Sequence, residues 1–228
     1  MKTVLGLGAV ILLLAAGCAT TQRQKVEEQP AICAFLGEAC SELKPGASGE
    51  ASLRYVNPNS QPTKYKKMIV EVVGFFGADS AKVPLKDQQM LTDLFRKTLN
   101  DELAKKYQIV DQSGPDVARI RVAILDAEAA TPGARSVTMV IPQLRLLTTG
   151  AMLVTGKYPF SGSAQAVAKV SDSETGQIIG AGVDRRTGGG SIQSAAQWQW
   201  GDAENAIKKW CELITNGMYA YTSGEKKP

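Results

Sequence analysis

The stretch VARIRVAILD, residues 117–126, has the regular alternation of a β-strand. Its apolar side chains recur at every second residue, with arginines at two of the positions between them: Ala118, Ile120, Val122 and Ile124. Successive side chains of a strand point to opposite faces of the sheet, so this spacing predicts one buried face and one half-solvated face. The stretch therefore indicates a sheet that is covered by helices on one side.

The same period of two returns in residues 164–170 and again in residues 177–186. Between them, the sequence DSETG at 172–176 collects residue types that favour turns. Two alternating runs joined by a short turn predict a long β-hairpin. The many alanines and glycines of its two arms predict that a helix packs closely against it.

Two short strands and two amphipathic helices are expected around this hairpin. Residues 68–73 and 107–110 are β-branched runs typical of strands. One helix is expected between Pro84 and Leu103, and a last one after Asp202, which is expected to cap it. The order of elements predicts an α+β fold: a mixed, mainly antiparallel sheet of about five strands with two main helices packed on one face.

A single domain is expected over residues 63–222, followed by a polar tail at 223–228. Residues 18–62 are rich in Gln, Glu, Ser, Pro and Gly and lack a long periodic pattern, so they are predicted to form a flexible tether. Cys33 and Cys40 lie seven positions apart within it. In an oxidising compartment they are candidates for a disulfide; the alternative is two independent thiols.

The first 17 residues have the character of an export signal: Lys2 precedes an apolar run shorter than the roughly 20 residues that a membrane-spanning helix needs. Residues 14–18, LAAGC, resemble a bacterial lipobox. This resemblance implies cleavage before Cys18, a diacylglycerol thioether on its sulfur and acylation of its amino group. The alternative is ordinary secretion with a plain thiol at Cys18.

Lipidation would make membrane lipid the first partner of the mature chain. Three acyl chains hold a protein at a membrane almost permanently, because each buried methylene contributes ~0.8 kcal/mol. Ala19, where a retained lipoprotein of this kind would carry Asp, is typical of sorting to the outer membrane. The expected location is the bacterial cell envelope, anchored by lipid at the periplasmic face of the outer membrane.

Composition narrows the classes of function. The chain has 228 residues, a formal net charge of +4 and no histidine. The charge is too small to indicate nucleic-acid binding. Without histidine, triad hydrolases and histidine-based metal sites are excluded, and the cysteines lack the spacing of a zinc site. No metal and no cofactor is expected, and Cys211 is expected in the core or at its boundary.

The sequence resembles a family of bacterial lipoproteins known as domain of unknown function 3313. After the lipobox, the resemblance rests on a series of short motifs in the family's order: YKKMIVEV at 65–72, YQIV at 107–110, GPDVARIRVA at 114–123, DSETGQ at 172–177, GVDRR at 182–186, and WGDA at 200–203 with Trp210. The family has no established activity. The resemblance therefore implies location and fold, but no catalytic residue.

Four polar residues of the hairpin are candidates for chemistry: Asp172, Asp184, Arg185 and Arg186. A functional interpretation makes them an acid/base pair or an anion clamp. A structural interpretation has Asp172 capping its own turn and the arginines in solvated cross-strand pairs. The structural interpretation needs no further cause, and we prefer it.

Apolar residues between 137 and 160 form the most unusual segment, with only two charges among them. Glycines and prolines interrupt it, so it is expected either to fold over the sheet or to expose an apolar surface to lipid or another protein. Trp198 and Trp200 either stack on a partner or cover the start of the last helix. The candidate partner surface is Val140, Ile141, Leu144, Leu146, Leu147, Trp198 and Trp200.

Three classes of function remain. The first is a non-catalytic, lipid-anchored module that binds or supports an envelope assembly through a protein partner. The second is an enzyme that acts on an envelope substrate through carboxylates and arginines such as Asp172, Asp184 and Arg185. The third is a carrier of an apolar ligand between the helices and the sheet, which a sealed and close-packed interior would eliminate.

Overall fold

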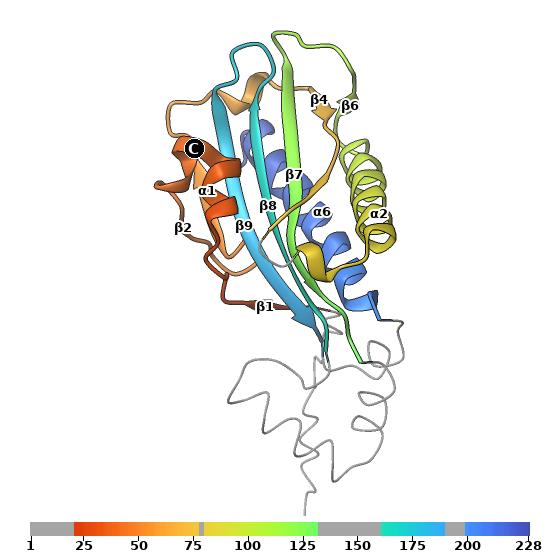
Figure 1. Ribbon diagram of the computed structural model, residues 1–228. Helices are drawn as coiled ribbons and strands as arrows, with labels where there is room; N and C mark the ends of the chain where they lie inside the picture. Colours follow the sequence, from red (N-terminus) through yellow and green to blue (C-terminus); the bar gives the residue numbers. More distant parts are fainter. Residues whose placement is uncertain (1–20, 78–79, 132–160, 190–198) are drawn as a thin grey trace, which may run out of the picture.

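The computed structural model describes residues 21–77, 80–131, 161–189 and 199–228. Within these ranges nine strands form one mixed sheet and three α-helices pack against it (Figure 1). The strands run in the order β2-β3-β9-β8-β7-β4-β6, with β1 paired to β9 and β5 to β7. A mixed sheet with helices is confirmed, but the expected number of strands, about five, was too small.

The predicted hairpin forms the centre of the sheet. β8 (Ser163–Asp172) pairs antiparallel with β7 (Val117–Glu128) on one side and with β9 (Ile178–Gly188) on the other. Gly176 has a φ of 75° in the connecting turn, a left-handed conformation that glycine adopts without strain. These long strands carry the alternation that made them recognisable in the sequence.

The parallel part of the sheet follows from a helical crossover. β4 (Lys67–Val70) pairs parallel with β7 and with β6 (Gln108–Ile109), while β5 (Gly74–Phe75) pairs parallel with β7. The helix α2 (Leu85–Leu103) connects β5 to β6, and η3 (Ser80–Lys82) precedes it. Parallel neighbours need such a crossover because the chain must return to the same end of the sheet.

The N-terminal segment is not a flexible tether from residue 21 onward. β1 (Thr21–Gln24) and β3 (Leu53–Val56) both pair antiparallel with β9, and β2 (Lys44–Pro45) pairs with β3. The side-chain amide of Gln165 also accepts a hydrogen bond from the backbone N–H of Glu27 and donates one to the Glu27 carbonyl. Both hydrogen bonds are 2.8 Å long. Short edge strands held by backbone bonds need no apolar period, which is why the composition misled the prediction.

Two helices cover one face of the sheet and a third covers the other (Figure 1). α2 and α6 (Gly201–Thr222) pack on the face that carries Ile120, Val122 and Ile124. On the opposite face, α1 (Pro30–Leu36) packs on Leu125 and its neighbours in β8 and β9. The expected half-solvated face of β7 is exposed in part at Arg119 and Arg121. It is buried at Ala123 and Leu125, because a helix from the supposed tether covers it there.

Apolar stripes fix the two main helices to each other and to the sheet. α2 buries Leu91, Phe95, Leu99 and Leu103 completely or almost so. Its Phe95 stacks on Trp210 of α6 with ring centroids 5.9 Å apart. Asp202 does not cap α6 as expected: Trp200 is the residue before the helix, and the Asp202 carboxylate accepts the Gly162 N–H at 2.8 Å.

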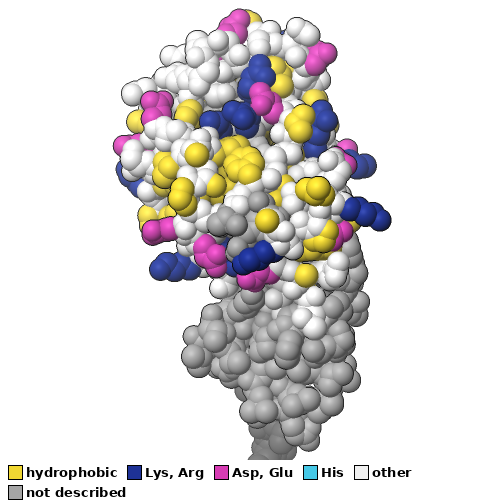
Figure 2. Space-filling view, in the orientation of Figure 1, with side chains coloured by type: hydrophobic (Ala, Val, Ile, Leu, Met, Phe, Trp, Pro, Cys, Tyr) yellow, Lys and Arg dark blue, Asp and Glu magenta, His cyan; other side chains and the backbone are white. Residues whose placement is uncertain are grey.

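The molecular surface on the α1 side mixes both signs of charge with scattered apolar side chains (Figure 2). The described residues include no helix of sufficient length and hydropathy to cross a membrane. Large apolar side chains exposed in these ranges are Val72, Phe76 and Leu85. Single exposed apolar residues are normal on a folded domain and mark no site by themselves.

Candidate functional site

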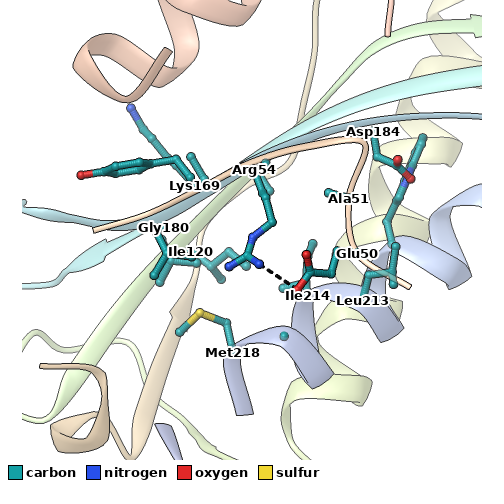
Figure 3. A pocket seen from close by; sticks show the side chains of 18 of the residues that line it. Glu50, Ala51, Arg54, Ile120, Lys169, Gly180, Asp184, Leu213, Ile214 and Met218 are labelled. Atoms are coloured by element: carbon teal, nitrogen blue, oxygen red, sulfur yellow. Dashed lines mark hydrogen bonds and ion pairs between the residues drawn. The ribbon is translucent and has the colours of Figure 1, made fainter. Parts of the chain in front are cut away.

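A cavity of about 380 Å³ lies between the second half of α6 and the sheet. Figure 3 shows Leu213, Ile214 and Met218 of α6 on one side and Ile120 and Gly180 of the sheet on the other. The size is within the range of small-molecule sites, roughly 300 to 1,000 Å³. Most of the side chains that line the cavity are apolar.

Small residues produce this hollow. On the sheet, the register places Ala168 of β8 opposite Gly182 of β9, and Val170 opposite Gly180. On α6, Gly217 follows Ile214 by three residues and precedes Tyr221 by four, so it lies on the stripe that faces the cavity. A Cβ built on Gly217 meets no atom within 4 Å. The prediction that small residues of the hairpin pack closely against a helix is confirmed at Gly188, which meets Asp202 of α6. Beside Ala168, Gly180 and Gly182 the small residues leave an open space instead.

A cluster of charges stands at the mouth of the cavity. Arg54 on β3 donates to the carboxylate of Glu50 at 2.7 Å, drawn as a dashed line in Figure 3. Lys226, beyond the end of α6, contacts the same Glu50 oxygen at 3.0 Å. The other nitrogen of the Arg54 guanidinium donates to the Tyr221 hydroxyl, and the guanidinium lies 5.7 Å from the centre of that ring.

The protonation of this cluster follows from its contacts. Partial burial opposes ionisation of Glu50, but hydrogen bonds from Lys226 and Arg54 outweigh it and lower its pKa to about 2. Burial also acts against the charge of Arg54, and the hydrogen bonds to Tyr221 and Glu50 outweigh it and raise the pKa of Arg54. At neutral pH the mouth therefore holds two cations and one carboxylate.

Asp184 is a buried residue that lines the same cavity. Its Oδ1 accepts hydrogen bonds from the backbone N–H and the hydroxyl of Ser52, at 2.8 and 2.6 Å. Its Oδ2 accepts from Nε of Arg186 at 2.7 Å and from the indole N–H of Trp210 at 3.0 Å. The buried aspartate thus connects β9, α6 and the N-terminal segment. The expectation that Arg185 and Arg186 form solvated pairs was wrong, because both side chains are buried. Arg186 lies beneath β1 and α6.

Asp172 lies at the turn of the hairpin, where its carboxylate has five donors. The N–H groups of Glu174 and Thr175 and the Thr175 hydroxyl bind one oxygen, and Lys64 and Tyr65 bind the other at 2.8 and 2.9 Å. Burial opposes ionisation, yet these donors, Lys64 first, hold the pKa of Asp172 well below its usual range. Burial and the neighbouring Asp172 raise the pKa of Tyr65 to about 12.

Arg185 points to the opposite face of the sheet from Asp184. It donates to Asp126 and to the Ser163 hydroxyl, both at 3.0 Å, and forms an ion pair with Glu27 at 2.8 Å. The four polar candidates therefore do not form one site. The register of the hairpin separates Asp172 from the other three, and the alternation of β9 separates Arg185 from its two neighbours.

The predicted partner surface is only partly within the described ranges. Val140, Ile141, Leu144, Leu146, Leu147 and Trp198 lie outside them. Trp200 is 4% exposed and belongs to the core under α6, so it forms no surface. Its position agrees with the alternative that it covers the start of the last helix.

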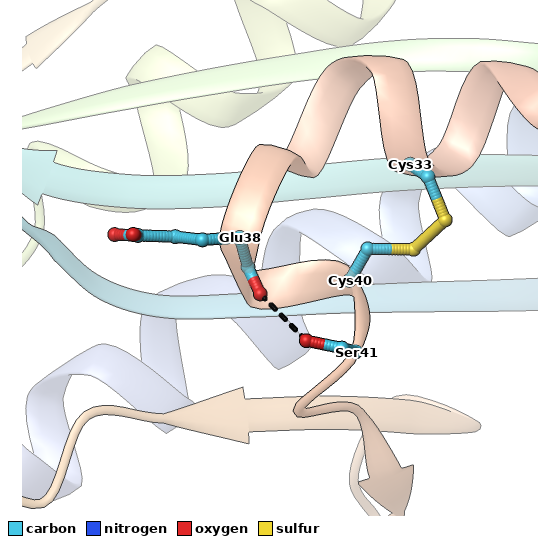
Figure 4. Close-up of a disulfide and its surroundings, with 4 residues drawn as sticks. All are labelled: Cys33, Glu38, Cys40 and Ser41. Carbon is cyan, nitrogen blue, oxygen red and sulfur yellow. Dashed lines mark hydrogen bonds between the residues drawn. A yellow bond between two sulfur atoms is a disulfide. The ribbon is translucent and has the colours of Figure 1, made fainter.

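The cysteines fall into three situations. Cys33 and Cys40 form a disulfide between α1 and the short helix η1 (Gly37–Cys40), with their Cα atoms 5.1 Å apart (Figure 4). Cys211 is buried on α6, and burial raises the pKa of its thiol. Cys18 lies outside the described residues. Among the residues described, no group of three acidic or cysteine side chains converges on a common point where a metal could bind.

Sequence reasoning missed the residues that shape the cavity and its mouth. Glu50 and Arg54 lay in the supposed tether, and Lys226 in the polar tail. Lys169 belongs to β8, but its side chain points away from the cavity (Figure 3). It donates a hydrogen bond to the Phe35 carbonyl of α1 at 2.5 Å. One signal was available: Gly217 interrupts the apolar stripe of a helix, where glycine is unfavourable by about 1 kcal/mol relative to alanine.

Comparisons with solved structures give distant matches. The chain is similar to the PelC dodecamer protein from Paraburkholderia phytofirmans, with 9% identity over 71% of this chain and 96% of that chain, and a TM-score of 0.40. It is also similar to protein XCC0632 from Xanthomonas campestris, with 11% identity over 75% of this chain and 93% of that chain, and a TM-score of 0.39. Likenesses at this level carry no argument about function.

The family comparison is more extensive. Comparison with curated proteins found no match. A family model described as "Protein of unknown function (DUF3313)" matches residues 34–214. The match begins within α1, ends within α6 and covers well over half of the chain. The chain therefore belongs to the family of Protein of unknown function (DUF3313).

Proposed function

We propose that this protein is a lipid-anchored envelope module that binds an apolar ligand between α6 and the sheet and carries out no chemistry on it. The observation that carries the proposal is the cavity of about 380 Å³, with its apolar walls. Apolar pockets of this size with a few polar groups at one side are the usual form of small-ligand sites. The proposal combines two of the classes that the sequence leaves open, the lipid-anchored binding module and the carrier of an apolar ligand.

The cavity supports binding because covering its apolar walls with a ligand removes them from water, which is favourable in free energy. Leu213, Ile214 and Met218 are only partly buried although they lie on the inner side of α6. Removing apolar surface from water contributes about 25 cal/mol per Å². An apolar ligand would bury these side chains and leave the charged groups at the mouth in contact with water.

The arrangement of polar side chains favours binding over catalysis. Asp172, Asp184 and Arg185 were the candidates for an enzyme, and they stand at separate places in the fold. Asp184 is the one that borders the cavity, and both of its oxygens already accept hydrogen bonds from protein donors. A general base needs a free position within hydrogen-bond reach of its substrate.

The anchor is part of the proposal and rests on the leader and on Cys18. We expect the mature chain to begin at Cys18 with three acyl chains and to be located at the periplasmic face of the outer membrane. Mass spectrometry of the protein from a bacterial envelope fraction tests this. A bare thiol at position 18, or a retained leader, would contradict the anchor without affecting the cavity.

An envelope protein partner remains a second element of the proposal. The apolar segment 137–160 motivates it, since so few charges interrupt that stretch. Site-specific photocrosslinking from Leu146 in cells, followed by mass spectrometry, is the direct test. Recovery of neither an envelope protein nor a lipid would count against a partner at this segment.

The cavity itself is tested with a neutral photoreactive probe, a diazirine analogue of hexadecanol, added to the full chain in lipid nanodiscs. We expect crosslinks to peptides of α6 around residues 209–221. Gly217→Phe fills the space and should abolish them, and Ala168→Phe fills it from the sheet as a second variant. Lys208→Phe places the same side chain on the exposed side of α6 and should leave the crosslinks unchanged.

The outcome separates the alternatives. Crosslinks that survive in folded Gly217→Phe and Ala168→Phe, as judged by circular dichroism, would show that the probe does not occupy the cavity. Loss of crosslinks in Lys208→Phe as well would indicate binding to an outer surface of α6. Either result would reject the proposed function.

A further inference from the structure

The mouth of the cavity carries more positive than negative charge. Arg54 and Lys226 share one carboxylate, that of Glu50, and both contact its Oε1. The hydroxyl of Tyr221 accepts from Arg54 beside them. Ser60, Lys209 and Asn216 are further polar residues that line the cavity. Two cations and one anion leave a net positive charge where the apolar walls end.

The position of Glu50 shows that a carboxylate fits between these two cations. Its carboxylate reaches Arg54 at 2.7 Å and Lys226 at 3.0 Å, so the two cations are already held in positions that fit an anionic group between them. Glu50 also accepts the N–H of Ala47 at 3.1 Å with its other oxygen, within its own loop. An incoming anion can therefore replace Glu50 at the cations while Glu50 keeps a partner.

Resting on the function proposed above, we propose that the ligand is a single-chain amphiphile with an anionic head group, which Arg54 and Lys226 bind at the mouth in place of Glu50. In this proposal the acyl chain lies against Leu213, Ile214 and Met218, whose side chains are drawn in Figure 3, and the head group stays at the edge of the solvent. Carboxylate and phosphate head groups share this chemistry, because arginine and lysine bind both.

Glu50 is then a competitor that sets the affinity. Its pKa of about 2 keeps it ionised at neutral pH, so it opposes the head group whenever the ligand binds. Removing its charge should strengthen binding of an anionic ligand and leave a neutral ligand of the same length unaffected. Removing Lys226 should have the opposite effect on the anionic ligand alone.

The experiment compares diazirine analogues of hexadecanoic acid, hexadecyl phosphate and hexadecanol on the full chain in nanodiscs. In Glu50→Gln, the acid and the phosphate should crosslink at roughly tenfold lower concentration, while the alcohol is unchanged. In Lys226→Gln, both anionic probes should need roughly tenfold more. Lys227→Gln removes a neighbouring exposed charge from the same tail and should change nothing.

The results distinguish a failure of the proposed anionic head group from a failure of the cavity as the binding site. Equal responses of the acid, the phosphate and the alcohol to Glu50→Gln and Lys226→Gln would overturn the anionic head group, although loss of all three in Gly217→Phe would still support the cavity. A response of only the acid or only the phosphate identifies which anion the site takes. Crosslinks unaffected by Gly217→Phe would overturn both proposals together.

Discussion

The two halves of α6 lie along the same sheet but pack against it differently. In the first half the inward side chains are almost completely buried: Ala203, Ala206, Ile207 and Trp210. In the second half, the side chains that border the cavity are only partly covered: Leu213, Ile214 and Met218. Thr215 and Thr222 of the same half are buried. One helix thus contributes both to a close-packed core and to the wall of an open cavity.

The contact at the start of α6 explains the contrast. A Cβ on Gly188 would lie 2.1 Å from Oδ1 of Asp202, so the helix and β9 approach there as closely as glycine allows. Because β-sheets twist, close contact at one end of a helix does not carry over to its other end. Only large side chains could fill the gap between the second half of α6 and the sheet. At this place the sheet carries the small residues Ala168, Gly180 and Gly182. A cavity of this kind is a property of two surfaces and not of either one.

The largest effect is expected at the junction of the two halves, from Asp184→Asn. The amide would leave the buried Arg186 without its counter-charge. Its NH₂ group would also face N–H groups that themselves donate, those of Arg186 and Trp210 or of Ser52. Removing one partner of a buried ion pair typically destabilises by about 3–5 kcal/mol. Guanidinium denaturation followed by tryptophan fluorescence measures it. Asp101→Asn, on an exposed ion pair, is the control, and a similar small loss in both would contradict this role.

A matched pair of isoleucines tests the contrast directly. Ile207→Ala removes a completely buried side chain and should lower the free energy of unfolding by about 2–5 kcal/mol. Ile214→Ala removes a side chain that already borders open space, so we expect a loss of about 1 kcal/mol or less. Both are measured by the same denaturation experiment. Equal losses would mean that the second half of α6 is packed as tightly as the first.

Two glycines should respond to alanine with opposite signs. Gly188→Ala forces a methyl group against Asp202 and should destabilise by about 1–3 kcal/mol. Gly217→Ala places a methyl group in open space within a helix and should stabilise by about 0.5–1 kcal/mol. Thermal and chemical denaturation of both variants decide the point. Destabilisation by Gly217→Ala would show that no free space exists beside it.

The smallest expected effect concerns the acid dependence of stability. The pKa of Asp172 is lower in the folded chain than its unfolded value of about 3.9, so its ionised form favours folding at neutral pH. This contribution is present above pH 4 and decreases as the pH falls toward the folded pKa. Asp172→Asn should therefore reduce the difference in unfolding free energy between pH 7 and pH 3. An unchanged difference would assign the acid dependence to other groups, such as Glu50.

Local periodicity predicted the long elements well. The alternation from Ala118 to Ile124 and the turn at 172–176 predicted a strand and a hairpin that the structure contains. The stripe ending at Leu103 and the one through Trp210 predicted both main helices. These patterns are visible in a sequence because each long element buries its own repeating face.

The short elements of the N-terminal segment had no such pattern. β1, β2 and β3 are four residues long or shorter, and backbone pairing with β9 holds β1 and β3 in place. Because nothing in the segment repeats, its sequence predicts a tether. That error removed Glu50 and Arg54 from the candidates for a site, and with them the mouth of the cavity.

The amino-acid sequence was enough to establish the family resemblance, the hairpin and the two amphipathic helices, because each depends on neighbours along the chain. The tertiary structure alone decided that Asp184 and Arg185 face opposite sides of the sheet with different partners. It also decided that Gly217, Ala168 and Arg54 border one hollow. The physical reason is that an empty volume has no residues of its own: it exists only where distant surfaces, once brought together, fail to fill the space between them.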